Sequence, residues 1–313
     1  MKKYGFGVDI GGTTCKIGLF ETNGTLLDDW EIPTNTANAG AAILDDISAA
    51  IEGKIKEKSI SKDNIQGVGV GVPGPVKSDG TVLKCVNLGW GVFNVTKVLE
   101  EKTGLTVKAG NDANVAALGE MWQGGGMGHE DVVVVTLGTG VGGGIIVNGK
   151  MVAGANGAGG EIGHMLMNEE EKESCNCGKK GCLEQYASAT GIVRMAKQML
   201  ASDSHETSLR AIENLTAKDI FDAAKANDEV AYALAEKLGE VLGTALASIA
   251  CVVNPEVIVI GGGVSKAGTI LLDVTKKYFT KKTFHACADT EFALAKLGNH
   301  AGMYGCVKLL LDK

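Results

Sequence analysis

Hydrophobic residues along this chain fall into short strand-like runs separated by longer helical patterns. Runs rich in valine and isoleucine predict strands at residues 5–20 and 132–147, each broken by a glycine turn, and at residues 66–72 and 256–260. Apolar residues spaced three or four positions apart predict helices over 41–58, 95–102, 113–122, 188–200, 217–226, 229–251, 266–278 and 301–311. Strands that alternate with helices predict an α/β fold whose central sheets are covered by helices.

One part of this pattern occurs twice. A strand, a glycine turn, a second strand and an Asn-Gly hairpin follow one another at residues 5–24 and again at residues 132–149. Aligning the two glycine turns places Asp9 on Thr136. The repeat predicts an internal duplication in which a glycine-rich turn opens each half of the chain.

The duplication leads us to expect two α/β domains with related sheet cores. We expect the small domain at residues 1–110 and the large domain at residues 111–299, with the boundary falling between about 105 and 130. The last helix, within residues 300–313, is expected to pack back on the small domain.

Composition and charge narrow the possible functions. Glycine makes up 45 of the 313 residues, about twice its usual share of ~7%, and it clusters where backbones turn tightly or approach a ligand. The net charge of −7 argues against a surface that binds nucleic acid. The sequence has no apolar run of about 18 residues and no signal-peptide segment, so we expect a cytoplasmic protein that does not span a membrane.

The two glycine turns are candidates for binding phosphate, because backbone N–H groups can approach anionic oxygens where no Cβ intervenes. The second turn consists of Gly138, Thr139 and Gly140. The first adds a carboxylate, two hydroxyls and a lysine that suit Mg²⁺ and triphosphate oxygens, and its residues are Asp9, Gly11, Gly12, Thr13, Thr14 and Lys16. A single glycine turn is common in α/β proteins, but two such turns favour a nucleotide. A P-loop signature is absent, and the strand that follows Gly140 disfavours a Rossmann dehydrogenase.

Asn111 and Asp112 open the helix predicted from Ala113. Both are ordinary residues for the N-cap of a helix. However, residues 107–110 before them look like the end of a strand, and sites in α/β sheets lie at the carboxyl ends of strands. The helix dipole would also keep an aspartate at this position ionised. We therefore interpret Asp112 as a candidate general base.

Three cysteines lie within eight residues of one another, downstream of a histidine. Cys175, Cys177, Cys182 and His164 form a Cys₃His set, which is typical of tetrahedral zinc. A disulfide with one spare thiol, or three inert cysteines, would suit a cytosolic chain less well. Because protein atoms fill all four positions, the zinc would be structural. The other cysteines, interpreted as small buried hydrophobes, are Cys15, Cys85, Cys251, Cys287 and Cys306.

Glu161 and Glu184 flank this cysteine cluster and are not needed as ligands. Held in place by the metal site, their carboxylates could accept hydrogen bonds from a polyhydroxylated ligand.

Taken together, these motifs resemble the ROK family of repressors, open reading frames and sugar kinases. The resemblance covers residues 5–305, and it rests on Asp9-Ile10-Gly11-Gly12-Thr13, Asn111-Asp112, the run from Leu137 to Gly144, Glu161-Ile162-Gly163-His164 and the cysteine cluster. Within the family the chain is most similar to the bacterial ATP-dependent glucokinases. The resemblance implies an actin-like, hexokinase-type fold in which two domains close on sugar and ATP across a cleft.

The resemblance also implies roles for individual residues. Asp112 would take the proton from the 6-hydroxyl of glucose, and the two glycine turns would hold the phosphates of ATP with Mg²⁺. One ring nitrogen of His164 would bind zinc and the other would donate to a sugar hydroxyl. The adenosine would lie near Gly261, Gly262, Gly263 and Ser265. Further sugar contacts are implied for Gly74, Asn87, Asn111, Glu161 and Glu184, of which Asn87 lies in the least distinctive motif.

Several alternatives stay open at this point. The acceptor could be another hexose, such as N-acetylglucosamine, N-acetylmannosamine, fructose or allose, and the donor could be polyphosphate. A sugar-responsive repressor would need a DNA-binding segment ahead of the first turn, and Asp9 lies only nine residues from the start of this sequence. A sugar sensor without catalytic activity is a further alternative. We expect a homodimer or a higher homo-oligomer.

Overall fold

The computed structural model describes residues 2–202 and 204–312. The chain divides into two compact units, and each is made of segments that are distant in the sequence. The first unit contains Met1–Glu130, Gly144–Gly160 and Leu297–Lys313, and the second contains Asp131–Gly143 and Glu161–Lys296. In the described part of the chain, no helix combines the length and the apolar character needed to cross a lipid bilayer.

The first sheet has five strands in the order β3-β2-β1-β4-β7. Strands β1, β2 and β3 are antiparallel neighbours, whereas β4 is parallel to both β1 and β7. The carboxyl ends of β1, β4 and β7 therefore meet at one edge of the sheet. The strands span β1 (Tyr4–Ile10), β2 (Thr14–Glu21), β3 (Leu26–Pro33), β4 (Ile65–Val72) and β7 (Val107–Asn111).

The second sheet repeats this arrangement with the order β10-β9-β8-β11-β12. Its register repeats too, because Asp9 pairs with Gly71 in the first sheet and Thr136 pairs with Gly261 in the second. The predicted duplication and the correspondence of Asp9 with Thr136 are therefore confirmed. The strands span β8 (Val132–Leu137), β9 (Val141–Val147), β10 (Lys150–Met151), β11 (Val257–Gly261) and β12 (Glu291–Leu294).

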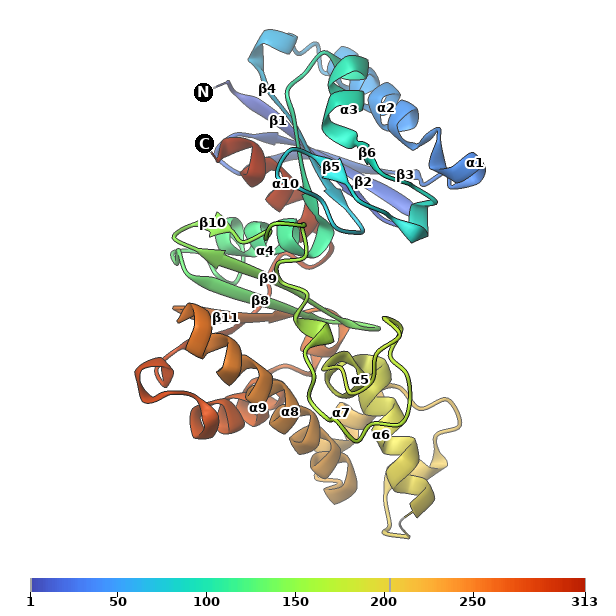
Figure 1. Cartoon of the computed structure of the whole chain (residues 1–313), viewed down its shortest axis with the longest axis vertical. Helices are drawn as coiled ribbons and strands as arrows, with labels where there is room; N and C mark the ends of the chain where they lie inside the picture. The colour runs from blue at the N-terminus through green and yellow to red at the C-terminus, as the bar shows by residue number, and fades with distance from the viewer. Residues whose placement is uncertain (1, 203, 313) are drawn as a thin grey trace. The chain divides into compact units, whose positions relative to one another are not determined.

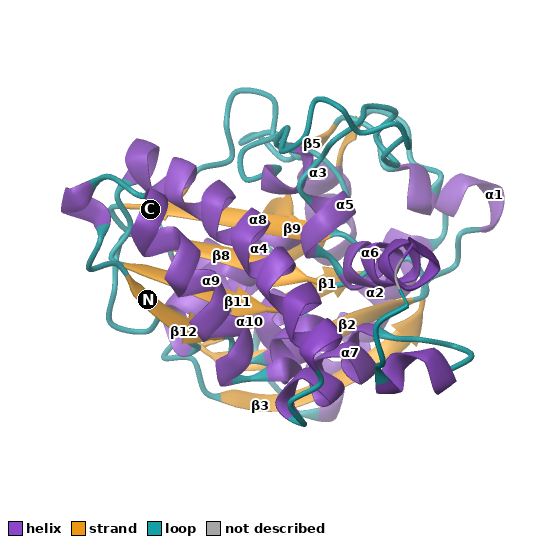
Figure 2. Ribbon diagram, turned by 90° about the horizontal axis from the view of Figure 1, so that it is seen from below, coloured by secondary structure: helices purple, strands orange, loops and turns teal. Residues whose placement is uncertain are grey.

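The helices, drawn in purple in Figure 2, follow the predicted ranges closely. Those of the first unit are α1 (Ala37–Gly40), α2 (Ile43–Glu57), α3 (Val95–Thr103), α4 (Asp112–Gln123) and α10 (Ala301–Leu311). Those of the second unit are α5 (Glu184–Ala187), α6 (Ala189–Ser202), α7 (Ala217–Lys225), α8 (Glu229–Val253) and α9 (Thr269–Lys282).

Several local features differ from the prediction. Strand β12 and the short helices α1 and α5 were not expected, and Cys251, interpreted as buried, is exposed near the end of α8. The helix expected at 266–278 begins only at Thr269, because Gly268 adopts a φ of +78° and separates it from a short 3₁₀ turn at Gly263–Ala267. A small hairpin of β5 (Thr81–Val82) and β6 (Phe93–Asn94) was not predicted. Strands of two residues are too short to show a period of alternating polarity.

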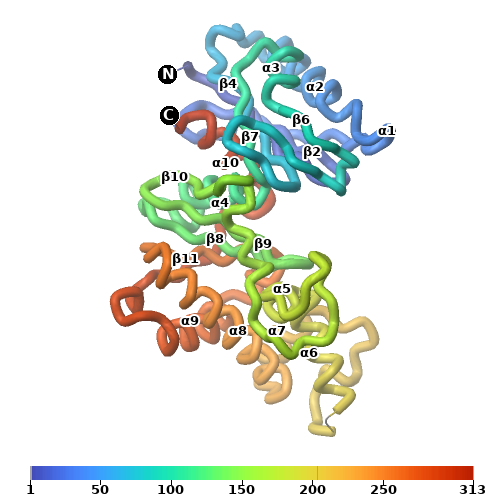
Figure 3. The backbone as a smooth tube through the Cα atoms, in the orientation of Figure 1, coloured from blue at the N-terminus to red at the C-terminus, as the bar shows by residue number. Residues whose placement is uncertain are grey.

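Helix α10 lies directly on the first sheet, although it comes last in the chain (Figures 1 and 3). Glycines in the strands make this close approach possible: a Cβ atom at Gly7 would lie 2.1 Å from the carbonyl oxygen of Met303, and one at Gly69 would lie 1.9 Å from that of Cys306. The opposite face of the sheet buries valine, isoleucine and phenylalanine side chains in a core shared with α2 and α3.

The two compact units group the segments of the chain differently from the ranges 1–110 and 111–299. Helix α4 packs against α10 and therefore belongs to the first unit, so that unit extends to Glu130 instead of ending at residue 110. Gly305 explains how closely the two helices cross, since a Cβ at this position would lie 1.5 Å from the carbonyl oxygen of Val115. Residues 144–160 also join the first unit, which the pattern of hydrophobic residues did not indicate.

Candidate functional site

The carboxyl edge of the first sheet brings together two carboxylates that the sequence indicated. Asp9 lies near the end of β1, and Asp112 is the first residue of α4, directly after β7. Burial raises the pKa of Asp9 to about 6, with a further contribution from the charge of Asp112 and an opposing one from Lys16, its neighbour across β2. Burial is the larger cause and repulsion from Asp112 the smaller one, and a cation bound beside the two carboxylates would favour the ionised form against both.

Asn111 connects this edge to the loop after β4. Its side-chain oxygen accepts a hydrogen bond from the N–H of Asn114 at 3.1 Å and so caps α4, while its amide nitrogen donates to the carbonyl of Gly74 at 3.2 Å. Asn111 therefore acts as a helix cap and also holds the Gly74 loop beside the start of α4. Asn87 is exposed on the short turn Val86–Leu88.

Each glycine turn is closed by a hydrogen bond of its own. In the first turn the N–H of Gly11 donates to the carbonyl of Thr14, and in the second the N–H of Gly138 donates to the carbonyl of Gly140, both at 3.0 Å. A Cβ added to Gly12 or Gly138 would meet no atom within 4 Å, so one side of each turn is open. A phosphate group could approach each turn from this open side.

A third glycine segment follows β11 in the second unit. Gly262 has a φ of +82°, and a Cβ there would lie 2.5 Å from the carbonyl oxygen of Leu137, so this position requires glycine. The hydroxyl of Ser265 donates to the carbonyl of Gly262 at 2.7 Å and is thus engaged within the turn. Next to this segment is a cavity of about 300 Å³, whose lining combines apolar residues such as Ala189, Phe221 and Val264 with the polar residues Thr216, Lys218, Asp222 and Lys266.

The predicted metal ligands of the second unit converge. The ligand atoms of His164, Cys175, Cys177 and Cys182 all lie within 4.8 Å of one another. The sulfurs of Cys177 and Cys182 are 3.6 Å apart, and the sulfur of Cys175 is 3.8 Å from Nδ1 of His164. Two ligands of a tetrahedral zinc ion at ~2.3 Å would be separated by roughly 3.7 Å, so this set fits zinc.

Glu184 lies between the cysteine cluster and the second glycine turn. Its Oε1 atom is 2.8 Å from the sulfur of Cys175, and its Oε2 atom would be 2.6 Å from a Cβ placed on Gly140. On the other side of the cluster, Oε2 of Glu161 lies 4.0 Å from Nε2 of His164. Nδ1 of His164 therefore faces the cysteines, and Nε2 faces Glu161.

The sequence comparisons agree with these features. The model of the ROK family matches residues 5–313. The chain belongs to the ROK family. A glucokinase of Halalkalibacterium halodurans is 46% identical over 306 residues, which cover 96% of this chain and 92% of that protein.

Solved structures of ROK proteins support the predicted fold. The ROK family glucokinase from Streptomyces griseus, in complex with glucose and AMPPNP, has a TM-score of 0.76 and 34% sequence identity, covering 98% of each chain. ROK members also include a putative xylose repressor from Caldicellulosiruptor sp., which is 29% identical over 98% of this chain and 77% of its own length. The predicted two-sheet α/β fold of the actin-like type is thus confirmed.

The site residues predicted for this ROK protein fall into two groups, one in each unit. The first unit holds Asp9 to Lys16, Gly74, Asn87, Asn111 and Asp112, and the second holds Gly138 to Gly140, Glu161, Glu184, Gly261 to Ser265 and the metal cluster. Within each unit the contacts described above join most members of the group.

A group of hydrogen bonds holds the loop between His164 and Cys175, and the ROK motifs did not predict it. We call this group the Glu171–Arg194 clamp. Glu171 lies between the first two predicted ligands in the sequence, and it accepts hydrogen bonds from Arg194 at 2.9 Å and from the hydroxyl of Tyr186 at 2.6 Å. Its hydrogen bond from Arg194 is the main reason that the pKa of Glu171 is lowered to about 2. Arg194 also donates to the carbonyl of Gln185, so α6 fixes both the loop and α5.

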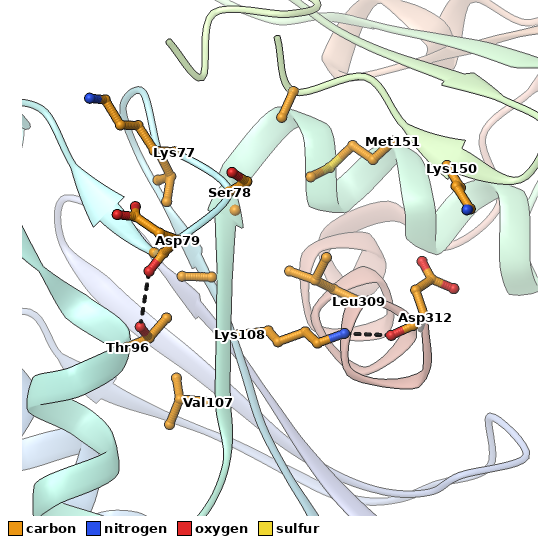
Figure 4. Close-up of a pocket in the computed structure, with 15 residues that line it drawn as sticks. Lys77, Ser78, Asp79, Thr96, Val107, Lys108, Lys150, Met151, Leu309 and Asp312 are labelled. Atoms are coloured by element: carbon orange, nitrogen blue, oxygen red, sulfur yellow. Dashed lines mark hydrogen bonds between the residues drawn. The ribbon is translucent and has the colours of Figure 1, made fainter. Parts of the chain in front are cut away.

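A separate cavity of about 360 Å³ lies in the first unit of this ROK protein, and the residues that line it include none of those predicted to form a site (Figure 4). Met151, Leu309 and Lys108 line it, and Lys108 donates to the backbone carbonyl of Asp312. The charged ends of Lys77 and Lys150 point away from each other in this view, so they do not converge on one ligand.

Proposed function

We propose that this ROK protein catalyses the ATP-dependent phosphorylation of glucose at its 6-hydroxyl. The observation that carries the proposal is the placement of Asp112 at the carboxyl edge of the first sheet, close enough to Asp9 to affect its pKa. A glucokinase that is 46% identical over nearly the whole chain supports the choice of glucose.

Asp112 serves as the base in this proposal. Phosphoryl transfer requires positioning and charge stabilisation more than covalent chemistry from the protein. The Asp112 carboxylate would accept the proton of the attacking hydroxyl from a distance of ~2.6–3.2 Å. Asn111 keeps Asp112 in place because it caps the same helix.

Asp9 is the residue that would hold hydrated Mg²⁺ together with the phosphates of ATP. Mg²⁺ takes few carboxylates and keeps several waters. The cation would neutralise negative charge on the phosphates and on the Asp9–Asp112 pair. The glycine turns at 11–14 and 138–140 would direct N–H groups at the phosphate oxygens, and the cavity beside Gly263 has a lining of apolar and polar residues that suits adenosine.

Zinc in the Cys₃His cluster would have a structural role. It would fix the ring of His164 and the carboxylate of Glu184, which we assign with Glu161 to the sugar hydroxyls. Polar groups that a bound sugar covers are left unpaired by an analogue that lacks the matching hydroxyl, at about 1–3 kcal/mol for each group. The pocket should therefore select among sugars by their hydroxyl pattern.

The test of this proposal is release of ADP in a coupled assay over a panel of hexoses. We expect the highest kcat/KM with glucose, a lower value with 2-deoxyglucose and a low value with N-acetylglucosamine. Comparable values for glucose and N-acetylglucosamine would reassign the acceptor but keep the sugar-kinase mechanism. Activity with polyphosphate in place of ATP would reassign the donor, and sugar binding without turnover would indicate a regulator.

The family resemblance also underlies our proposal that the protein is a cytoplasmic homodimer or higher homo-oligomer. Light scattering after size exclusion would measure the mass in solution, and a mass of one chain at assay concentrations would contradict it.

A further inference from the structure

The carbonyls of each glycine turn accept hydrogen bonds from a segment that contains a threonine. In the first turn the hydroxyl of Thr34, the residue after β3, donates to the carbonyl of Gly11 at 2.7 Å. The N–H of Thr34 donates to the carbonyl of Thr13 at 2.8 Å, so one residue binds two carbonyls of the same turn.

The second turn is held in the same way from a different part of the chain. The hydroxyl of Thr190, in the first turn of α6, donates to the carbonyl of Thr139 at 2.6 Å. The N–H of Ala189 donates to the carbonyl of Gly138 at 2.8 Å. The buried hydroxyl of Ser188 donates to the carbonyl of Glu184 at 2.6 Å and caps α6 at the N–H of Gly191, which fixes the start of the helix relative to Glu184.

These hydrogen bonds determine which backbone groups each turn presents. The carbonyl oxygens of Gly11, Thr13, Gly138 and Thr139 would repel a phosphate. They instead accept hydrogen bonds from Thr34 and from the segment Ala189–Thr190. Among the described residues, no hydrogen-bond partner is found for the N–H groups of Gly12, Thr13, Thr139 or Gly140. A peptide unit that loses its carbonyl partner can rotate and replace an N–H with an oxygen, so the threonine hydroxyls control the chemistry of the open side.

We propose that Thr34 and Thr190 are positioning residues, each holding one glycine turn with its N–H groups directed toward the phosphates of the nucleotide donor. The inference rests on the proposed kinase function for the identity of the ligand. Neither threonine belongs to the motifs that indicated the family, and neither is assigned to the sugar site or to proton transfer. Because their hydroxyls bind carbonyls of the turns, we expect their loss to reduce affinity for the donor far more than affinity for the sugar.

The experiment compares Thr34→Val and Thr190→Val, which remove the hydroxyl and keep the shape, with Thr34→Ser and Thr190→Ser, which retain it. Thr22→Val is the matched control, because Thr22 also donates to a backbone carbonyl, that of Lys2 at 3.0 Å, away from both turns. The dissociation constant of AMPPNP with Mg²⁺ is measured by calorimetry without sugar. The KM values for ATP and glucose, kcat and the melting temperature are measured alongside.

We expect each valine variant to weaken AMPPNP binding and to raise the KM for ATP by about tenfold, the loss of one hydrogen bond at a site of oriented backbone. The KM for glucose should stay within about twofold, and the serine variants and Thr22→Val should behave like the wild type. Unchanged AMPPNP affinity in both valine variants would overturn the inference. So would serine variants as impaired as the valine variants, or equal rises in both KM values.

The calorimetric measurement separates this inference from the proposed function. If the wild-type protein binds AMPPNP but phosphorylates no hexose, the proposed function fails and the comparison of AMPPNP affinities still decides the role of the threonines. If the wild-type protein does not bind AMPPNP with Mg²⁺, both are overturned.

Discussion

Asp9 should make the ligand-free protein less stable as the pH rises, and Asp9→Asn should remove this effect. The pKa of Asp9 is about 6 in the folded protein and ~3.9 for an ordinary aspartate. A group whose pKa is raised by folding contributes stability that is fully present below the unfolded pKa. That contribution is lost as the pH rises through the folded pKa, here between about pH 4 and pH 6.

The size of the effect follows from the difference between the two pKa values. Two pH units at ~1.4 kcal/mol each give about 3 kcal/mol at pH 8, as an upper limit. The first turn of α10 reduces this figure, because Gly302 lies against the Asp9 carboxylate and a helix N-terminus favours the ionised form by about 0.3–1 kcal/mol. We therefore expect Asp9→Asn to be more stable than the wild type by about 2 kcal/mol at pH 8 and equally stable near pH 4.

Urea unfolding followed by tryptophan fluorescence can measure this difference. All three tryptophans, Trp30, Trp90 and Trp122, lie in the first unit with Asp9, so the signal reports on that unit. The measurements would be made at pH 4.5, 6 and 8, without magnesium or nucleotide. Asp46→Asn, at an exposed aspartate in the first turn of α2, is the control: it should change the free energy of unfolding by less than about 1 kcal/mol, and by a similar amount at each pH.

The reasoning would be refuted if Asp9→Asn gave no added stability at pH 8, or the same gain at pH 4.5 as at pH 8. Saturating Mg²⁺ with nucleotide should stabilise the wild type more at pH 8 than at pH 6, because the cation supplies the missing positive charge. The same addition should have little effect on Asp9→Asn.

Three further predictions concern the other groups of the site. Asp112→Asn should lower kcat by at least ~10²–10⁴ while leaving glucose binding by calorimetry largely intact, and a variant that keeps a tenth of wild-type kcat would exclude Asp112 as the base. Protein purified without added metal should contain one zinc per chain by elemental analysis. Cys177→Ser should lose the zinc together with stability and activity, whereas Cys251→Ser, outside the cluster, should keep the zinc. A Cys175–Cys182 disulfide without metal would contradict this prediction. Arg194→Met should speed the capture of zinc by a chelator, because Arg194 holds the loop between the first two ligands, and an unchanged rate would show that the loop does not depend on this clamp.

Much of the fold could be predicted because local signals and the duplication agree. Valine runs that end in glycine predicted the central strands. The repeat of turn and hairpin in the sequence corresponds to two sheets with the same strand order and the same register between their central strands. The grouping of α4 with the first unit could not be predicted from the pattern. It depends on α4 packing against α10, a contact between segments that are distant in the sequence and made possible by single glycines.

Some residues of the candidate site could likewise be identified from the sequence, and others could not. Cys175, Cys177 and Cys182 could be found from their spacing, because the ligands of a small metal site lie close together in the chain. Thr34 and Thr190 could not, since each is an ordinary threonine whose role depends on a carbonyl elsewhere in the sequence. Ser188 offered a partial signal as a helix cap, but nothing in its neighbourhood indicated the hydrogen bond to Glu184.

The position of α10 on β1 and β4 has a consequence for how the protein is made. Most of the chain is synthesised after β4 and before α10. At about 5–20 residues per second, the glycine-containing face of the first sheet therefore stays without α10 for roughly ten seconds or more. The longer segment of the second unit, Glu161–Lys296, is complete before α10 leaves the ribosome. The unit whose strands are translated first is therefore the last that can finish folding, and during this interval α10 does not cover its sheet.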